Sequence, residues 1–134
     1  IFPFTPPAEF TVCPPVLEAH SGTGEEVALI DIAANADGIS VCGINNPKIG
    51  IAVALKFPKK QLPWLTNWQH YGKGEYVTGI EPGTHPPIGQ SKTREDKTLL
   101  FIEPGESRIY DLEIDILNDP DNINQFIQES TITN

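Results

Sequence analysis

Glu81 is the residue whose type and surroundings best fit acid–base chemistry. It follows a strand-like stretch, residues 76–80, and is followed directly by Pro82. Proline favours extended backbone in the residue before it and has no N–H to donate, so the strand is expected to end near Glu81. A carboxylate at a strand end beside a Gly/Pro-rich loop is a common position for a functional group. The alternative is a solvated acid that only closes a strand.

Two further polar candidates follow Glu81 in the chain. His85 lies four residues later, and Arg94 lies in the same segment, residues 83–96. That segment is longer than a typical connection, so we expect a functional or mobile loop. His85 is a candidate for chemistry or an ordinary solvated histidine. Arg94 could hold a hydroxyl or an anionic group, or it could be a surface charge.

An aromatic stretch precedes the Glu81 strand. Trp64 and Trp68 lie on the same face of a predicted strand over residues 64–71, which ends at Tyr71. Their rings could stack on the apolar face of a pyranose, or they could pack in an ordinary core. His70, on the same face, is expected to be a surface histidine at a strand end.

Neither a cofactor nor a metal ion is expected. The sequence has no GxGxxG, P-loop, GxSxG or HExxH pattern. The histidines lack ligand spacing with one another and with the cysteines. The cysteines are interpreted as small buried hydrophobic residues, although two positions cannot decide whether a disulfide forms. The residues concerned are His20, His70, His85, Cys13 and Cys42.

Composition restricts the class of partner. The chain has 134 residues and a net charge of −9, so nucleic acid and anionic membranes are poor partners. No apolar run is long enough to cross a bilayer and no signal peptide is visible, so a cytoplasmic location is expected. The chain begins with Ile1 rather than methionine, so we expect a processed chain, a piece of a longer one or an incompletely represented one.

Short turn-bounded strands predict an all-β antiparallel β-sandwich with a short C-terminal helix. Residues 1–24 are proline-rich and are expected to form an extended arm or linker, with one short strand near residues 10–13; residues 25–134 are expected to form the sandwich domain. The Asp-Gly turn at 37–38 is expected to return residues 39–44 along the strand at 27–33. Further expected elements are strands at 49–57, 97–102 and 107–117, a turn at 103–106 and a helix at 122–128.

The expected strand at 107–117 alternates clearly between apolar and acidic residues. Tyr110, Leu112, Ile114 and Ile116 are expected to form its apolar face, and Asp111, Glu113 and Asp115 are expected to point to water. This is the pattern of a half-buried antiparallel strand.

Three blocks occur in order along the chain, namely residues 62–68 (LPWLTNW), 74–82 (GEYVTGIEP) and 101–108 (FIEPGESR) with 110–113 (YDLE). Together they resemble the C-terminal part of the DUF4432 family, and residues 46–50 (NPKIG) fit that family's upstream turn. These proteins are aldose 1-epimerase-like members of the galactose mutarotase-like superfamily. The resemblance covers roughly residues 25–130.

The resemblance implies a supersandwich fold, a sugar ligand and an isomerase that interconverts sugar anomers. Glu81 would be the general base that takes the proton from the anomeric hydroxyl, while a histidine protonates the ring oxygen. Asn67, Trp68, His85 and Arg94 would contact the sugar.

Two departures from the family pattern leave alternatives open. Mutarotase-like chains are longer, and their acid histidine lies in an N-terminal part without a counterpart here. The glutamine of the Leu-Glu-Thr-Gln-like motif is also missing. The alternatives are a non-catalytic carbohydrate-binding β-sandwich and a structural half-domain that requires a missing N-terminal portion. An open sheet edge would then be covered by a partner chain or by a second copy in a homodimer.

Overall fold

The computed structural model describes residues 25–70, 74 and 76–131. The expected N-terminal arm, with its short strand near residues 10–13, lies outside the described residues. Contacts between Cα atoms divide the chain into two compact units. The first unit contains residues up to Asp31 and Trp64–Leu100, and the second contains Ile32–Pro63 and the residues from Phe101 onward.

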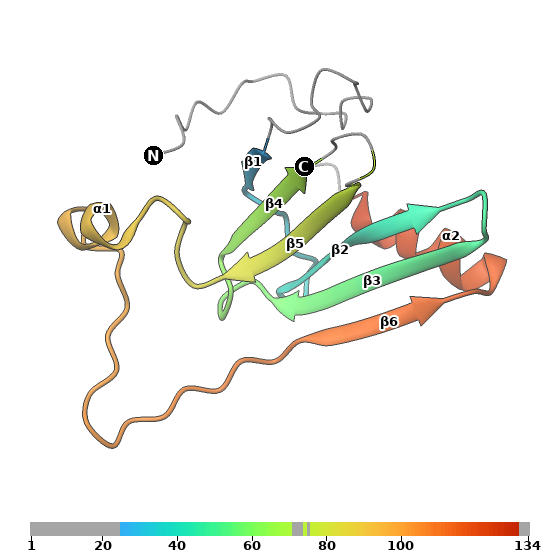
Figure 1. The fold of residues 1–134 in the computed structure, drawn as a ribbon. Coiled ribbons are helices and arrows are strands. Elements are labelled where there is room, and N and C mark those ends of the chain that lie inside the picture. The colour runs from blue at the N-terminus through green and yellow to red at the C-terminus, as the bar shows by residue number, and fades with distance from the viewer. Residues whose placement is uncertain (1–24, 71–73, 75, 132–134) are drawn as a thin grey trace. The chain divides into compact units, whose positions relative to one another are not determined.

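The first unit contains a three-stranded antiparallel sheet. Its strands are β1 (Glu25–Ile30), β4 (Trp64–His70) and β5 (Val77–Gly83), in the order β1-β4-β5 (Figure 1). A short helix, α1 (Gln90–Glu95), follows β5. β4 is the central strand and pairs on both sides, so its side chains are ordered by two neighbouring strands.

The second unit contains another three-stranded antiparallel sheet and a helix. Its strands are β2 (Ile39–Asn46), β3 (Ile51–Pro58) and β6 (Glu113–Leu117), in the order β2-β3-β6. The turn from β2 to β3 is closed by Asn46, whose side-chain oxygen accepts a hydrogen bond from the Lys48 amide at 3.1 Å. Gly50 completes the turn with a φ of +67°, a conformation that favours glycine.

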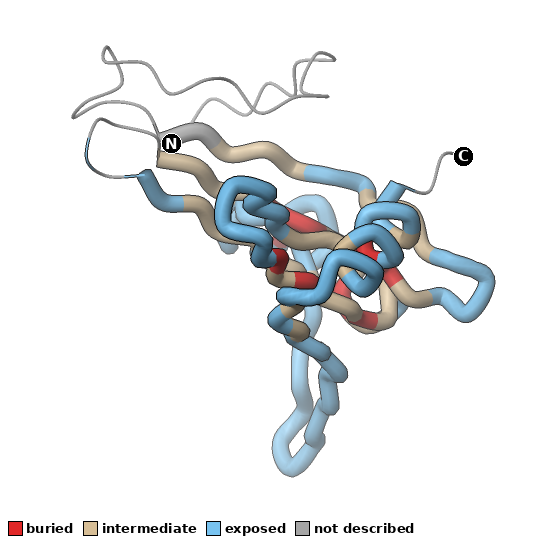
Figure 2. The backbone as a smooth tube through the Cα atoms, turned by 90° about the vertical axis from the view of Figure 1, so that its right-hand side faces the viewer, coloured by how far each residue is buried: buried red, intermediate tan, exposed pale blue. Residues whose placement is uncertain are grey.

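Helix α2 (Pro120–Ser130) covers one face of this second sheet. Asp119 caps its first turn by accepting hydrogen bonds from the amides of Asp121 and Asn122. Phe126 is 5% exposed and packs in a cluster with the strand residues Val41, Ala52 and Ala54. Alanines in β3 allow the aromatic ring to approach the sheet closely. The helix itself is exposed along most of its length (Figure 2).

The opposite face of the second sheet carries exposed apolar side chains on all three strands, although Phe57 on the same face is buried. Ile114 is 60% exposed and Ile116 is 75% exposed, and Ile44 and Ile51 on the neighbouring strands are exposed as well. The prediction that the side chains at 114 and 116 form a buried face is wrong. Because α2 packs on the side of β6 that carries Leu117, that side is the inner one.

Several expected elements differ from the structure. Residues 39–44 do not return along residues 27–33, because β1 pairs with β4 and β2 pairs with β3. The expected strand at 97–102 is not formed, and the strand expected from residue 107 begins only at Glu113. These segments have no strand partner within the described part of the chain, so their alternation produces no ladder. The expected loop at 83–96 contains α1.

The main features of the predicted fold are confirmed. All six strands are antiparallel, a helix ends the described chain, and the turn at 103–106 forms, with the Glu106 amide donating to the Glu103 carbonyl at 2.9 Å. Among the described residues, neither helix has the length and apolar character needed to cross a membrane.

Candidate functional site

The candidate site is one face of the β4–β5 ladder in the first unit. Residues directly opposite each other in an antiparallel pair project to the same face. Three cross-strand pairs define this face: Trp64 with Gly83, Thr66 with Glu81, and Trp68 with Gly79. We call it the Glu81 face. Each tryptophan stands opposite a glycine, so the position across from it on β5 carries no side chain.

β5 continues through Pro82 to Gly83, two residues beyond the expected strand end. Leu65 pairs with Pro82 and Trp64 with Gly83, so Glu81 lies within the ladder. Its side chain is exposed, whereas its partner Thr66 is only 6% exposed. A rigid strand pair therefore presents the carboxylate to solvent.

The carboxylate of Glu81 leans back over Gly79. A Cβ atom added at Gly79 would lie 3.2 Å from Cδ and 3.3 Å from Cγ of Glu81, and would overlap with Oε1. Position 79 stands directly opposite Trp68, and side chains at such paired positions are separated by about 5 Å at Cβ. The carboxylate thus occupies the space across from Trp68.

Trp68 is stacked with His70 on the same strand. Their ring centroids are 6.3 Å apart and their planes differ by 22°. Both side chains are half-buried. Alternate residues of a strand share a face, so His70 belongs to the Glu81 face. The β1 partners of Trp68 and Thr66 are Val27 and Leu29, which add an apolar border to this face.

Asn67 lies on the opposite face of the same ladder. Its side-chain nitrogen donates to Thr78 Oγ1 at 2.8 Å and to the Gly79 carbonyl oxygen at 2.9 Å. Its oxygen accepts a hydrogen bond from Gln69, and Thr78 Oγ1 donates to the Trp68 carbonyl at 2.9 Å. These side chains connect β4 and β5 behind the Glu81 face.

His85 and Arg94 lie in the segment that follows β5. His85 is exposed, and its Nδ1 atom lies 3.2 Å from the carbonyl oxygen of Pro86. Arg94 is an exposed residue of α1. The strand register therefore brings Trp68 and Glu81 together, places Asn67 behind them, and leaves His85 and Arg94 on separate elements.

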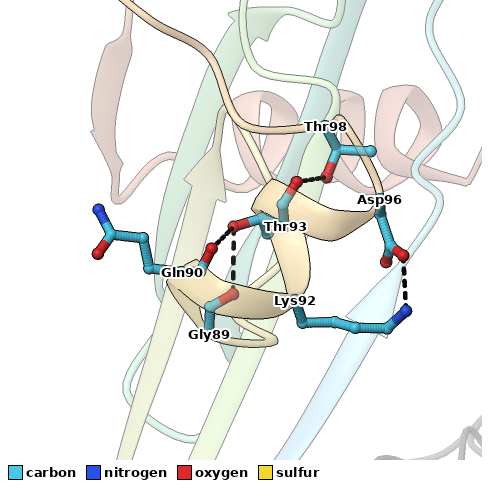
Figure 3. A network of polar contacts seen from close by, with 6 residues as sticks. All are labelled: Gly89, Gln90, Lys92, Thr93, Asp96 and Thr98. Atoms are coloured by element: carbon cyan, nitrogen blue, oxygen red, sulfur yellow. Dashed lines mark hydrogen bonds and ion pairs between the residues drawn. The ribbon is translucent and has the colours of Figure 1, made fainter.

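Thr93 is the organising residue of α1. It is fully buried, and its hydroxyl donates to the carbonyls of Gly89 and Gln90 at 3.1 and 3.0 Å (Figure 3). The Thr93 carbonyl accepts hydrogen bonds from the backbone and the hydroxyl of Thr98. Lys92 forms an ion pair with Asp96 one turn later. This network fixes the helix that carries Arg94.

A shallow polar groove lies on the second unit. It lies between β3, β6 and α2 and has a volume of about 250 Å³. Lys56 in this groove pairs with Glu113 and Asp115, each at 3.1 Å. The charge of the lysine is therefore matched within the protein. Among the described residues, no group of three or more His, Cys, Asp or Glu side chains could hold a metal ion.

Two residues of the Glu81 face are absent from the candidates that the sequence indicates. His70 is expected to be a surface histidine, although its parity with Trp68 already places both on one face. Gly79 is not among the candidates either. The signal for it is its position two residues before Glu81, which puts both on one side of a strand.

The comparisons with known proteins agree with the resemblance seen in the sequence. The chain is similar to a solved structure, that of a "putative aldose 1-epimerase" from Klebsiella pneumoniae subsp. pneumoniae, with 28% sequence identity and a TM-score of 0.74. The similarity covers 82% of this chain but 29% of the Klebsiella chain, so this chain spans less than a third of that protein. It supports the predicted β-sandwich class.

No functionally curated protein matches the chain. A family match, described as "Domain of unknown function (DUF4432)", extends over residues 5–116, which is most of the sequence. The chain therefore belongs to the DUF4432 family.

Proposed function

We propose that this chain is the base-carrying part of an aldose 1-epimerase-like isomerase that interconverts sugar anomers. The observation that carries the proposal is the placement of the exposed Glu81 carboxylate within the β4–β5 ladder, across from Trp68. The similarity to the Klebsiella protein supports it. Because the chain spans 29% of that protein, other groups of the site would come from further polypeptide.

The proposed chemistry follows from a carboxylate beside an aromatic ring. The sugar would stack its apolar face on Trp68 and direct its anomeric hydroxyl at Glu81. Glu81 removes that proton, the bond between the anomeric carbon and the ring oxygen breaks, and an acid protonates the ring oxygen. The open aldehyde rotates and closes from its other face, and both protons are returned. Catalysis is therefore assigned to positioned proton transfer.

Glu81→Gln tests this assignment. The amide keeps the shape of the side chain but cannot act as a base, so the rate of anomer interconversion should fall by about 10²- to 10⁴-fold. The rate is followed by polarimetry or NMR exchange with a panel of aldoses. Glu103→Gln, at an exposed glutamate outside the site, is the matched control and should keep the wild-type rate. Equal rates for Glu81→Gln and the wild type would refute the base assignment.

The same panel separates catalysis from binding alone. If the protein binds a sugar but does not accelerate its interconversion beyond buffer, the chain is a carbohydrate-binding module. In that case Trp68→Ala should weaken binding strongly, and Glu81→Gln should change it only modestly.

A second role is favoured by the exposed apolar face of the second sheet. Ile114 and Ile116 are exposed there, and large exposed apolar patches mark surfaces that bind other polypeptide. We propose as the second candidate a structural part of a larger epimerase-like protein that forms no complete site alone. Sugar binding by the isolated 134-residue chain would contradict this second candidate.

A further inference from the structure

Gly79 is a glycine that the backbone does not require. Its φ angle lies outside the left-handed region, in contrast to Gly38, Gly50 and Gly74. It lies inside β5, where a glycine weakens a strand because it has no side chain to pack. A strand-interior glycine without unusual backbone geometry commonly marks a close approach by another group. Here the approaching group is the side chain of Glu81.

The contacts that a Cβ atom would make at position 79 show how specific that approach is. The three atoms nearest to such a Cβ all belong to Glu81, and they are Oε1, Cδ and Cγ. The carboxylate therefore lies in the volume that any larger residue would fill. Because Glu81 is exposed, its side chain could adopt another rotamer if that volume were taken.

The neighbours of Gly79 hold its backbone in place. Its carbonyl oxygen accepts the side-chain hydrogen bond of Asn67 at 2.9 Å, from the opposite face of the ladder. Across the ladder stands Trp68, stacked with His70. The space above Gly79 is thus bounded by the Trp68 and His70 rings on β4 and by the backbone of β5.

We propose that Gly79 is a positioning residue, whose missing side chain allows the Glu81 carboxylate to lie across from Trp68. The inference rests on the proposed function, in which this carboxylate is the base and Trp68 carries the sugar. A side chain at 79 would displace the carboxylate from the stacked ligand. It would do so at little structural cost, because the displaced atoms are the end of a flexible, exposed side chain.

Gly83 provides a matched control on the same strand and the same face. It stands opposite Trp64, as Gly79 stands opposite Trp68, and its φ is likewise outside the left-handed region. A Cβ at Gly83 would meet the His85 carbonyl oxygen at 3.5 Å, which is ordinary van der Waals contact. Gly83→Ala therefore adds the same methyl group without displacing Glu81.

The first measurement is the rate of anomer interconversion. Gly79→Ala should lower kcat by about tenfold or more, because a displaced base is no longer aligned with its proton. It should do so to a greater extent than Gly83→Ala, and its unfolding temperature should stay close to that of Gly83→Ala. The double variant Gly79→Ala/Glu81→Gln should be no slower than Glu81→Gln alone, because Gly79 acts through Glu81. A double variant much slower than either single variant would overturn the inference.

The second measurement needs no sugar. The indole N–H signals of the two tryptophans are recorded by NMR and assigned with Trp64→Phe. Glu81→Gln and Gly79→Ala should both shift the Trp68 signal, whereas Gly83→Ala should shift only that of Trp64. If the wild-type protein moves no sugar, the proposed function fails, and this measurement still decides the role of Gly79. An unshifted Trp68 signal in Gly79→Ala would overturn the inference.

Discussion

Phe126 of α2 packs against Gly43 of β2 so closely that position 43 has no room for a side chain. A Cβ atom there would lie 2.9 Å from Phe126 Cζ and 3.0 Å from the Ala54 Cα, and would overlap with the Val53 carbonyl oxygen. Two of these three atoms belong to the backbone of β3 and cannot move without disturbing the sheet. The glycine is therefore required both by the close approach of β3 and by the contact with α2.

Gly43→Ala should destabilise the protein by about 1–3 kcal/mol or more, because overpacking forces backbone shifts. The free energy of unfolding in urea is the measurement. Gly83→Ala, where the added methyl has ordinary contacts, is the control and should change this free energy little. A Gly43→Ala protein as stable as the control would mean that β3 and α2 do not approach position 43 this closely in solution.

The ion pair between Lys56 and Asp115 should make the stability of the protein depend on pH. The hydrogen bond from Lys56 lowers the pKa of Asp115 below its usual 3.8, and the same bond raises the pKa of Lys56 above its usual 10.5. A carboxyl whose pKa is lowered on folding stabilises the folded state when ionised, and this contribution is lost as the pH falls through the folded pKa. The lysine contribution is lost as the pH rises above 10.5 through its own folded pKa.

Lys56→Met should therefore be less stable than the wild type at pH 7, and the difference should shrink as the pH falls below about 4. The midpoint of urea unfolding at pH 3, 5 and 7 measures it, and added salt should reduce the difference at pH 7. Lys60→Met removes an exposed lysine two residues after the end of β3 and serves as the control. The same stability difference at pH 3 and pH 7 would contradict the assignment.

Cys42 should react slowly with alkylating reagents. Burial raises the pKa of its thiol to about 11. The thiolate is the reactive form, so at pH 8 we expect alkylation about a hundredfold slower than for an ordinary exposed cysteine. The rate should rise about tenfold per pH unit up to that pKa. Mass spectrometry after iodoacetamide treatment of a Cys13→Ser variant measures Cys42 alone. A plateau near pH 8.5 would contradict a buried thiol.

Most strands and the C-terminal helix can be predicted from the sequence, because their signals are local. Alternation identifies the residues that form β2, β3 and β4, and Asp119-Pro120 marks the start of α2. The pairing of strands cannot be predicted, because an Asp-Gly turn can also connect two strands that belong to different sheets, as it does here. The inner face of β6 depends on where α2 packs, so alternation alone assigns Ile114 and Ile116 to the wrong side.

The sequence predicts the chemistry of the candidate site better than its geometry. The residue types of Glu81 and Trp68 suggest a base and a stacking ring, and the register puts them on one face. The space above Gly79 cannot be predicted, because it depends on which rotamer Glu81 adopts. The roles of His85 and Arg94 remain predictions. Both lie after β5, where no strand register relates them to Glu81.

Asn67 is expected to stabilise the β4–β5 pair from the face opposite Glu81. Its side chain donates to the Gly79 carbonyl and to Thr78, and Asn67→Ala would remove both hydrogen bonds. At roughly 0.5–1.5 kcal/mol for each hydrogen bond, the free energy of unfolding should fall by about 1–3 kcal/mol. The backbone of Gly79 would also lose its support, so we expect kcat to fall more than the affinity for sugar.

Gln69→Ala is the matched control for Asn67, because it lies two residues away on the same face of β4. It removes the bond that Gln69 donates to Asn67 and leaves both bonds from Asn67 to β5. We expect a smaller loss of stability and an unchanged amide signal of Gly79 in NMR spectra. If Asn67→Ala instead weakened sugar binding without lowering stability, Asn67 would contact the sugar directly, and the ladder would have to expose its other face to the ligand.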